Sequence, residues 1–184
     1  MTPLGAQLFR RIESTGPLTV ADYMLECLLN PHYGYYTTRD PLGTGGDFVT
    51  APEISQMFGE LIGLFLAQCW IDRGRPAPFQ LVELGPGRGT LMADLMRATA
   101  QVPGFHDAAR LHLVEASPVL RKAQSATIRH PITHHDRLDD VPDGPLYLVA
   151  NEFFDALPIR QFLRDGGAWR ERLVGLSDGK LSFG

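Results

Sequence analysis

The sequence predicts an α/β fold built on a doubly wound, parallel β-sheet. Short apolar segments alternate with helix-patterned segments, a glycine-rich turn joins the first strand to the first of these helices, and the pattern changes after Pro158. Strands are expected at 81–84, 111–115, 132–134 and 146–150, and helices at 91–100 and 118–128. Beyond Pro158, short apolar segments at 159–163, 169–175 and 181–183, separated by glycine-containing turns, predict antiparallel hairpins.

Two helices, separated by a loop, are expected before the first strand. Thr19, with Asp22 three residues later, is the expected N-cap of a helix that ends before Pro31. A longer helix is expected to begin after Thr50 and to end before Gly74. Its apolar residues cover more than one face, which predicts a largely buried helix; they are Ile54, Met57, Phe58, Leu61, Ile62, Phe65, Leu66, Cys69 and Trp70.

Size and composition exclude several classes of protein. The chain has 184 residues, of which 44% are hydrophobic and 21% charged, so a folded domain is expected and a disordered chain is not. The 17 basic and 21 acidic residues give a net charge of −4, which offers no electrostatic argument for a nucleic-acid partner. The two cysteines lack metal-ligand spacing. No segment approaches the ~20 apolar residues of a membrane span, and we expect a soluble intracellular protein.

The turn after the first strand is the strongest functional motif. Glu83 precedes Gly85, Gly87 and Gly89, which stand at alternate positions at the start of the expected helix. Glycines there let a ligand touch the backbone, and a helix N-terminus offers free N–H groups. Thr90 stands where a dinucleotide fingerprint would need glycine, which disfavours a dehydrogenase. The pattern acid-x-Gly-x-Gly-x-Gly is typical of S-adenosylmethionine-dependent methyltransferases, although an ordinary tight turn is the structural alternative.

Other candidate ligand residues follow the neighbouring strands. Glu115, at the end of the second strand, could accept hydrogen bonds from both ribose hydroxyls. His135 follows the weak third strand, where methyltransferases usually contact adenine. Adjacent strand residues face opposite ways, so His134 and His135 are not expected to chelate a metal, and no metal is predicted. The loop residues Gly45, Gly46 and Asp47 could fold over the methionine end of the cofactor, or form a hairpin tip without a ligand.

Three long motifs resemble the MidA family, to which mitochondrial complex I assembly factor 7 belongs. They span 46–60, 83–90 and 151–158, in the family's order. The resemblance implies a class I methyltransferase with a Rossmann-like sheet, the cofactor S-adenosyl-L-methionine, and protein-arginine methylation of a core complex I subunit. It also implies a place in the bacterial cytoplasm or the mitochondrial matrix. Family members are considerably longer, so we expect an incomplete parallel sheet whose free edge strand invites pairing with a second copy.

The methyl acceptor is expected at the carboxyl end of the strand at 146–150. Glu152 could hold a guanidinium bidentately, with Asp155 as a second partner, and the amide oxygen of Asn151 could hold an acceptor N–H or the cofactor's amino group. The alternative is that Asn151 and Asp155 only shape a turn.

The expected elements divide the chain into three parts: an N-terminal extension at 1–76, a partial cofactor-binding core at 77–158 and an antiparallel segment at 159–184. A non-catalytic assembly factor that binds the cofactor and a partner protein is the alternative function.

Overall fold

The structure is a computed structural model that describes residues 1–38 and 48–184, and its contacts divide the chain into two compact units. One unit combines Met1–Arg39 with Phe154–Gly184, and the other is Asp40–Phe153. This grouping differs from the linear division expected from the sequence. The N-terminal and C-terminal segments share one unit because a strand near residue 18 pairs with a strand near residue 174.

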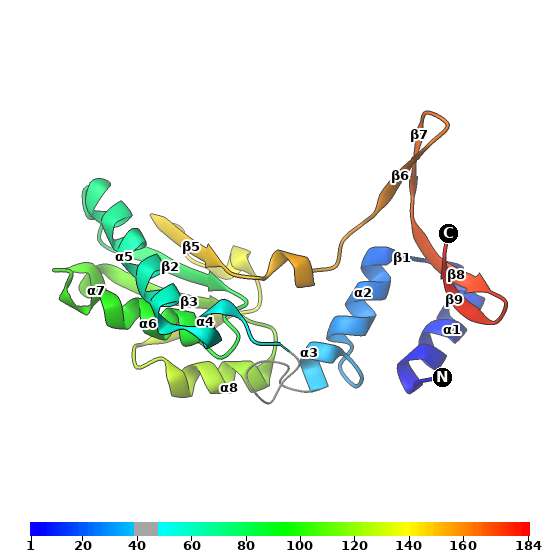
Figure 1. Ribbon diagram of the computed structural model, residues 1–184, viewed down its shortest axis with the longest axis horizontal. Coiled ribbons are helices and arrows are strands. Elements are labelled where there is room, and N and C mark those ends of the chain that lie inside the picture. The colour runs from blue at the N-terminus through cyan, green and yellow to red at the C-terminus, as the bar shows by residue number, and fades with distance from the viewer. Residues whose placement is uncertain (39–47) are drawn as a thin grey trace. The chain divides into compact units, whose positions relative to one another are not determined.

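The larger unit contains the expected parallel sheet (Figure 1). Its strands are β2 (Phe79–Leu84), β3 (Ala109–Val114), β4 (Ile132–His135) and β5 (Leu146–Ala150). They are all parallel, in the order β4-β3-β2-β5. The chain thus moves outward from β2 to β4 and then returns to the other side of β2. This reversal creates a topological switch point between β2 and β5, where open α/β sheets bind their ligands.

The helices of this unit pack on one face of the sheet. They are α5 (Gln56–Asp72), α6 (Thr90–Ala98), α7 (Phe105–Ala108) and α8 (Pro118–Thr127), and the 3-10 turn η1 (Thr99–Gln101) follows α6. A second 3-10 turn, η2 (Leu138–Asp140), lies between β4 and β5. The main core lies between them and the sheet, and an aromatic group of Trp70, Phe79 and Phe105 fills its centre. A smaller cluster of Val82, Leu84 and Val114 lies on the opposite face. The connections β2-α6-β3 and β3-α8-β4 therefore cross the same face of the sheet.

The helix expected between Thr50 and Gly74 is two helices, so the single-helix prediction is wrong. The first is α4 (Ala51–Ile54), and Ser55 adopts an extended conformation that separates it from α5. The side chain of Ser55 accepts a hydrogen bond from the Met57 backbone N–H and caps α5, whereas the Thr50 side chain caps nothing. A residue that satisfies a free helix N–H can begin a new helix inside an apolar segment.

The prediction that this helical segment is largely buried is also wrong. Its small residues Gly59, Gly63 and Ala67 are buried, while Ile54 is 73% exposed and Phe65 67% exposed. A Cβ placed on Gly63 would come within 2.9 Å of the Leu95 backbone. The glycines therefore bring α5 against α6 backbone to backbone. Trp70 lies in the main core, while Met57, Leu61, Leu64 and Phe65 of α5 face outward.

The smaller unit is built from helices and antiparallel strands at both chain ends. Its elements are α1 (Pro3–Thr15), β1 (Leu18–Thr19), α2 (Val20–Leu29), α3 (Tyr35–Thr38), η3 (Phe154–Ala156), β6 (Phe162–Asp165), β7 (Ala168–Glu171), β8 (Leu173–Ser177) and β9 (Lys180–Phe183). Strands β6 and β7 form one hairpin, and β8 pairs with both β9 and β1. Antiparallel hairpins after Pro158 are confirmed, but the segment expected at 169–175 is divided between β7 and β8, and residues 159–161 are not in a strand. The Thr19 cap is also confirmed, since its hydroxyl oxygen accepts from the Asp22 N–H at 3.0 Å. Among the described helices, none combines the length and apolarity needed to cross a bilayer.

The helix α1 was not expected from the sequence. Its Leu8 and Ile12 pack on Leu18 and Val174, and Thr2 caps it by accepting from the Gly5 N–H at 3.1 Å. Three of the four buried residues of this cluster thus come from the first 18 residues of the chain. The N-terminal segment supplies the core on which the C-terminal strands pack.

Candidate cofactor site

The strand register brings the predicted ligand residues to one edge of the sheet. Leu84 lies opposite Ala150 on β5 and Val114 on β3, and Val114 lies opposite His135 on β4. The residues that follow these strands are therefore level with one another. Backbone bonds continue the alignment beyond β2 and β3, since the Gly85 N–H donates to the Val114 carbonyl at 3.0 Å and the Glu115 N–H to the His135 carbonyl at 3.1 Å.

The glycine-rich turn needs glycine for two separate reasons. Gly85, Gly87 and Gly89 all have left-handed backbone conformations, with φ of 59°, 55° and 84°. A Cβ on Gly85 would also lie 2.4 Å from the ring of Phe153, which packs over the turn from the segment after β5. Gly89 is the N-cap of α6, so the turn delivers the free N–H groups of that helix to the edge of the sheet.

Glu83 is a buried carboxyl group beneath this turn. It is 3% exposed, and one of its oxygens has no hydrogen-bond partner among the described residues. Burial raises its pKa to about 8, although a hydrogen bond from the Met92 backbone N–H in the first turn of α6 opposes the shift. The carboxyl group therefore ties β2 to α6 and leaves its other oxygen without a partner among the described residues.

Glu115 is held by two donors after β3. Its Oε1 accepts from the Ser117 backbone N–H at 2.8 Å, and its Oε2 accepts from Gln124 Nε2 at 3.3 Å. Burial raises its pKa, and these hydrogen bonds act in the opposite direction. Arg121, one turn before Gln124 on α8, donates from Nε to the Glu115 carbonyl at 2.7 Å and from Nη2 to the His135 carbonyl at 2.9 Å. The ends of β3 and β4 are thus fastened to α8.

The histidines of β4 face opposite sides of the sheet, as the alternation of strand residues requires. His134 Nε2 lies 2.9 Å from Gln124 Oε1 on the helix-covered face. His135 Nε2 lies 2.8 Å from His112 Nδ1, and His112 Nε2 lies 2.7 Å from Gln80 Oε1. Because the Gln80 oxygen can only accept, His112 carries its proton on Nε2, and His135 donates to it. His135 is the last residue of β4, and its ring contacts His112.

Two of the three candidate catalytic residues directly follow β5. Asn151 is half-buried, and Glu152 is exposed with a left-handed φ of 48°, a conformation that non-glycine residues rarely adopt. Such strain is concentrated at functional sites. Asp155 belongs to the smaller unit, within η3. The pKa of Tyr36 in the same unit is raised, first by burial of its hydroxyl and then by the charge of Asp155. Asp155 therefore lies outside the unit that holds the sheet.

Sequence reasoning missed several polar contacts around the turn. Glu53 of α4 accepts a hydrogen bond from the Thr90 hydroxyl at 2.6 Å, which ties α4 to the start of α6. Its place in the 46–60 motif was the available signal, but local sequence does not show that Thr90, 37 residues away, lies beside it. Gln124 was missed too, although it lies four residues after the buried Leu120 on the inner side of α8. The proposed loop residues Gly45, Gly46 and Asp47 lie outside the described residues.

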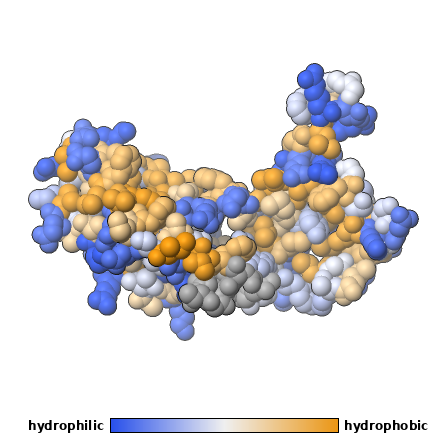
Figure 2. Space-filling view, viewed as in Figure 1, coloured by the Kyte–Doolittle hydropathy of each residue, from blue (hydrophilic) through white to orange (hydrophobic). Residues whose placement is uncertain are grey.

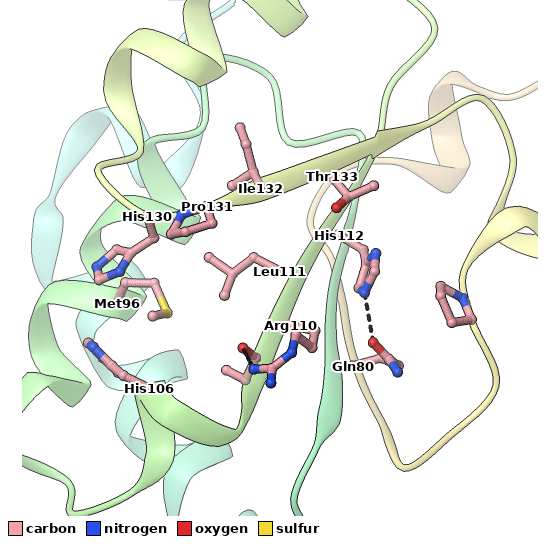
Figure 3. Close-up of a pocket in the computed structure, with 12 residues that line it drawn as sticks. Gln80, Met96, His106, Arg110, Leu111, His112, His130, Pro131, Ile132 and Thr133 are labelled. Atoms are coloured by element: carbon pink, nitrogen blue, oxygen red, sulfur yellow. Dashed lines mark hydrogen bonds between the residues drawn. The ribbon is translucent and has the colours of Figure 1, made fainter.

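A cavity of about 530 Å³ lies at the other end of the sheet, by the amino ends of β3 and β4 (Figure 3). His106 and His130 stand near Met96 on one side, and the hydrogen-bonded pair Gln80 and His112 stands on the other. The glycine turn and the other predicted ligand residues lie at the carboxyl ends of the strands, so this cavity is not part of the predicted cofactor site. Within residues 1–38 and 48–184, no group of three or more His, Cys, Asp or Glu side chains could hold a metal.

The residues at the carboxyl edge fit S-adenosylmethionine. The left-handed glycines allow close approach to the backbone, Glu83 offers an unused buried oxygen beneath the turn, and Glu115 is fixed at the edge of the next strand. A parallel sheet with these features at its switch point defines a Rossmann-like fold of the class I methyltransferase type. A family model described as "Putative S-adenosyl-L-methionine-dependent methyltransferase" matches residues 61–183, and the chain belongs to that family.

Relatives in other organisms and a solved structure agree with this assignment. The chain is 43% identical to "Protein arginine methyltransferase NDUFAF7, mitochondrial" of Bos taurus over 199 residues, covering 95% of this chain and 45% of that protein. It is 44% identical to the Drosophila melanogaster homolog of that protein, covering 96% and 46%. The chain thus spans about half the length of these curated relatives. A Burkholderia thailandensis protein crystallised with S-adenosyl-homocysteine superposes with a TM-score of 0.79 at 30% identity, covering 98% of this chain and 49% of that one.

Proposed function

We propose that this chain forms the cofactor-binding part of an S-adenosylmethionine-dependent protein-arginine methyltransferase. The observation that carries the proposal is the carboxyl edge of the sheet, where the left-handed glycine turn and the fixed Glu115 follow neighbouring strands at the same level and the buried Glu83 lies beneath the turn. The names of the curated relatives support arginine as the acceptor. Bound S-adenosylmethionine would supply an electrophilic methyl group.

The residues of the sheet edge would divide the remaining work. Glu115 would accept hydrogen bonds from the ribose hydroxyls, and His135 would lie by the adenine. Glu83 and the N–H groups at the start of α6 would fix the turn against the amino-acid end, with Gly45, Gly46 and Asp47 on its outer side. Glu152 would hold the acceptor guanidinium bidentately and keep electron density on the attacking nitrogen. Asn151 would orient the acceptor N–H or the cofactor's amino group, and Asp155 would be a second carboxylate partner.

The acceptor protein and the compartment belong to the same proposal. The family resemblance implies a core subunit of respiratory complex I as the protein substrate. The curated relatives named here are mitochondrial proteins, which supports the mitochondrial matrix if the source is eukaryotic. For a bacterial source, the proposal is the cytoplasm, as the family resemblance implies.

Two measurements test the proposal. Isothermal titration calorimetry should detect binding of S-adenosylhomocysteine and no binding of NAD. Transfer of a labelled methyl group from S-adenosylmethionine to an arginine-containing partner protein should then be measurable, and an arginine-to-lysine change in that partner should abolish it. Absence of S-adenosylhomocysteine binding even at millimolar ligand would overturn the cofactor assignment.

A second candidate is a non-catalytic assembly factor that binds the cofactor and a partner protein. The exposed apolar residues of α4 and α5 favour it, since exposed apolar patches commonly mark interaction sites. They include Ile54, Met57, Leu61 and Phe65, and Figure 2 shows apolar side chains gathered over α4 and along α5. Cofactor binding without methyl transfer to a partner that the protein binds would favour this candidate over the enzyme.

A further inference from the structure

Gln124 is a polar side chain with no solvent exposure, on the inner side of α8. A buried amide is costly unless its donors and acceptor are paired. Gln124 pairs both ends: Nε2 donates to the Gly87 carbonyl at 2.7 Å and to Glu115 Oε2 at 3.3 Å, while Oε1 lies 2.9 Å from His134 Nε2. One side chain therefore joins the glycine turn, the acid after β3 and the strand β4.

The contacts of Gln124 allow only one orientation of its amide group. The Gly87 carbonyl and the Glu115 carboxylate both accept hydrogen bonds, so only the NH₂ group can face the two of them. The amide oxygen must then face His134, whose Nε2 carries the proton. Turning the amide over would place its oxygen against two acceptors, so the three bonds are formed or lost together.

We propose that Gln124 is a positioning residue of the cofactor site, which holds the Glu115 carboxylate in the orientation that receives the ribose hydroxyls. The inference rests on the proposed function and extends it to a residue outside the glycine motif. Ser117 restrains Oε1 of the carboxylate and Gln124 restrains Oε2, and each oxygen keeps a lone pair for a hydroxyl. The bond to Gly87 fixes the distance between this carboxylate and the turn.

Replacing Gln124 by methionine tests this role, because methionine keeps the volume and removes all three hydrogen bonds. Thr99→Val is the matched control: Thr99 is equally buried, and its hydroxyl donates to the Leu95 carbonyl at 2.9 Å after α6, away from the turn. Both variants are compared with the wild-type chain by urea unfolding and by calorimetry with S-adenosylhomocysteine and its 2′-deoxy analogue. The deoxy analogue separates ribose recognition from general damage to the fold.

The expected result is a selective loss of ribose recognition in Gln124→Met. Its affinity for S-adenosylhomocysteine should fall about tenfold or more, as for the loss of a hydrogen bond to a charged group, and the preference over the deoxy analogue should shrink towards one. Thr99→Val should keep both the affinity and the preference of the wild type. A Gln124→Met protein that folds and keeps the wild-type preference would overturn the inference, whereas a wild-type chain that binds neither ligand would overturn the proposed function with it.

A second substitution guards against a variant that fails to fold. Gln124→Glu places a carboxyl group against Glu115 and the Gly87 carbonyl, so two like charges face each other once both are ionised. The affinity of Gln124→Glu for S-adenosylhomocysteine should fall more steeply than the wild-type affinity as the pH rises from 5 to 8. Near pH 5 the two affinities should be similar. Parallel pH profiles for the two proteins would contradict the placement of Gln124 beside Glu115.

Discussion

The raised pKa of Glu83 makes a quantitative prediction about stability. In the folded chain its pKa is about 8, against 4.5 for a free glutamate, because the carboxyl group is buried. Between these values the folded state holds a proton that the unfolded state releases, so the free energy of unfolding falls as the pH rises. The slope is roughly 1.4 kcal/mol per pH unit, which amounts to about 2.5 kcal/mol between pH 5.5 and 7.5.

The Glu83→Gln variant removes this titration and keeps an acceptor oxygen for the Met92 N–H. Urea unfolding of both proteins, without cofactor, at several pH values from 5.5 to 7.5 isolates the contribution of Glu83, since every other titrating group is shared. The variant should gain about 2.5 kcal/mol relative to the wild type across that range. Stability curves that run parallel for the two proteins would refute the assignment of a protonated, buried carboxyl group at this position.

Three further substitutions test the turn, the helix contact and the catalytic edge. Gly85→Ala should lower the free energy of unfolding by about 1–2 kcal/mol more than Gly74→Ala does, as measured by urea unfolding. Both positions have a left-handed φ, but only Gly85 faces a side chain, that of Phe153. Equal losses in the two variants would contradict the clash. Gly63→Ala should lower the unfolding free energy by about 1–3 kcal/mol despite the higher helix propensity of alanine, and a gain in stability would show that α5 and α6 are not in backbone contact. Glu152→Gln should leave S-adenosylhomocysteine affinity within about twofold and reduce methyl transfer by about a hundredfold or more, and unchanged transfer would refute its catalytic role.

Sequence patterns predicted the sheet because its physics is local. Buried parallel strands are short apolar runs, and β2, β3 and β5 are found where those runs occur. The turn was equally readable, since left-handed backbone conformations favour glycine and Gly85, Gly87 and Gly89 occupy such conformations. The pairing of β1 with β8 was not predictable in this way, because the two strands lie more than 150 residues apart and β1 has only two residues.

The missed features depend on which surfaces meet in three dimensions. A count of bulky apolar residues predicts a buried α5, but its closest contact is made by Gly59 and Gly63, which carry no hydrophobic signal. Gln124 is another example, since its amide is satisfied by groups 37, 9 and 10 residues away along the chain. Glutamine is usually exposed, so the spacing of Gln124 four residues after Leu120 was too weak a signal to predict its burial.

The contact between α5 and α6 also determines which parts of the larger unit move together when the glycine turn is displaced. At Gly59 and Gly63, α5 has no side chain of its own between its backbone and α6 that could absorb a displacement. α6 begins at the glycine turn, and its Thr90 is bonded to Glu53 of α4. A shift of the turn would therefore carry α4, α5 and α6 together as one stiff block. The exposed apolar side chains of α5 would move with these helices, so the outer surface of α5 and the glycine turn would be displaced together.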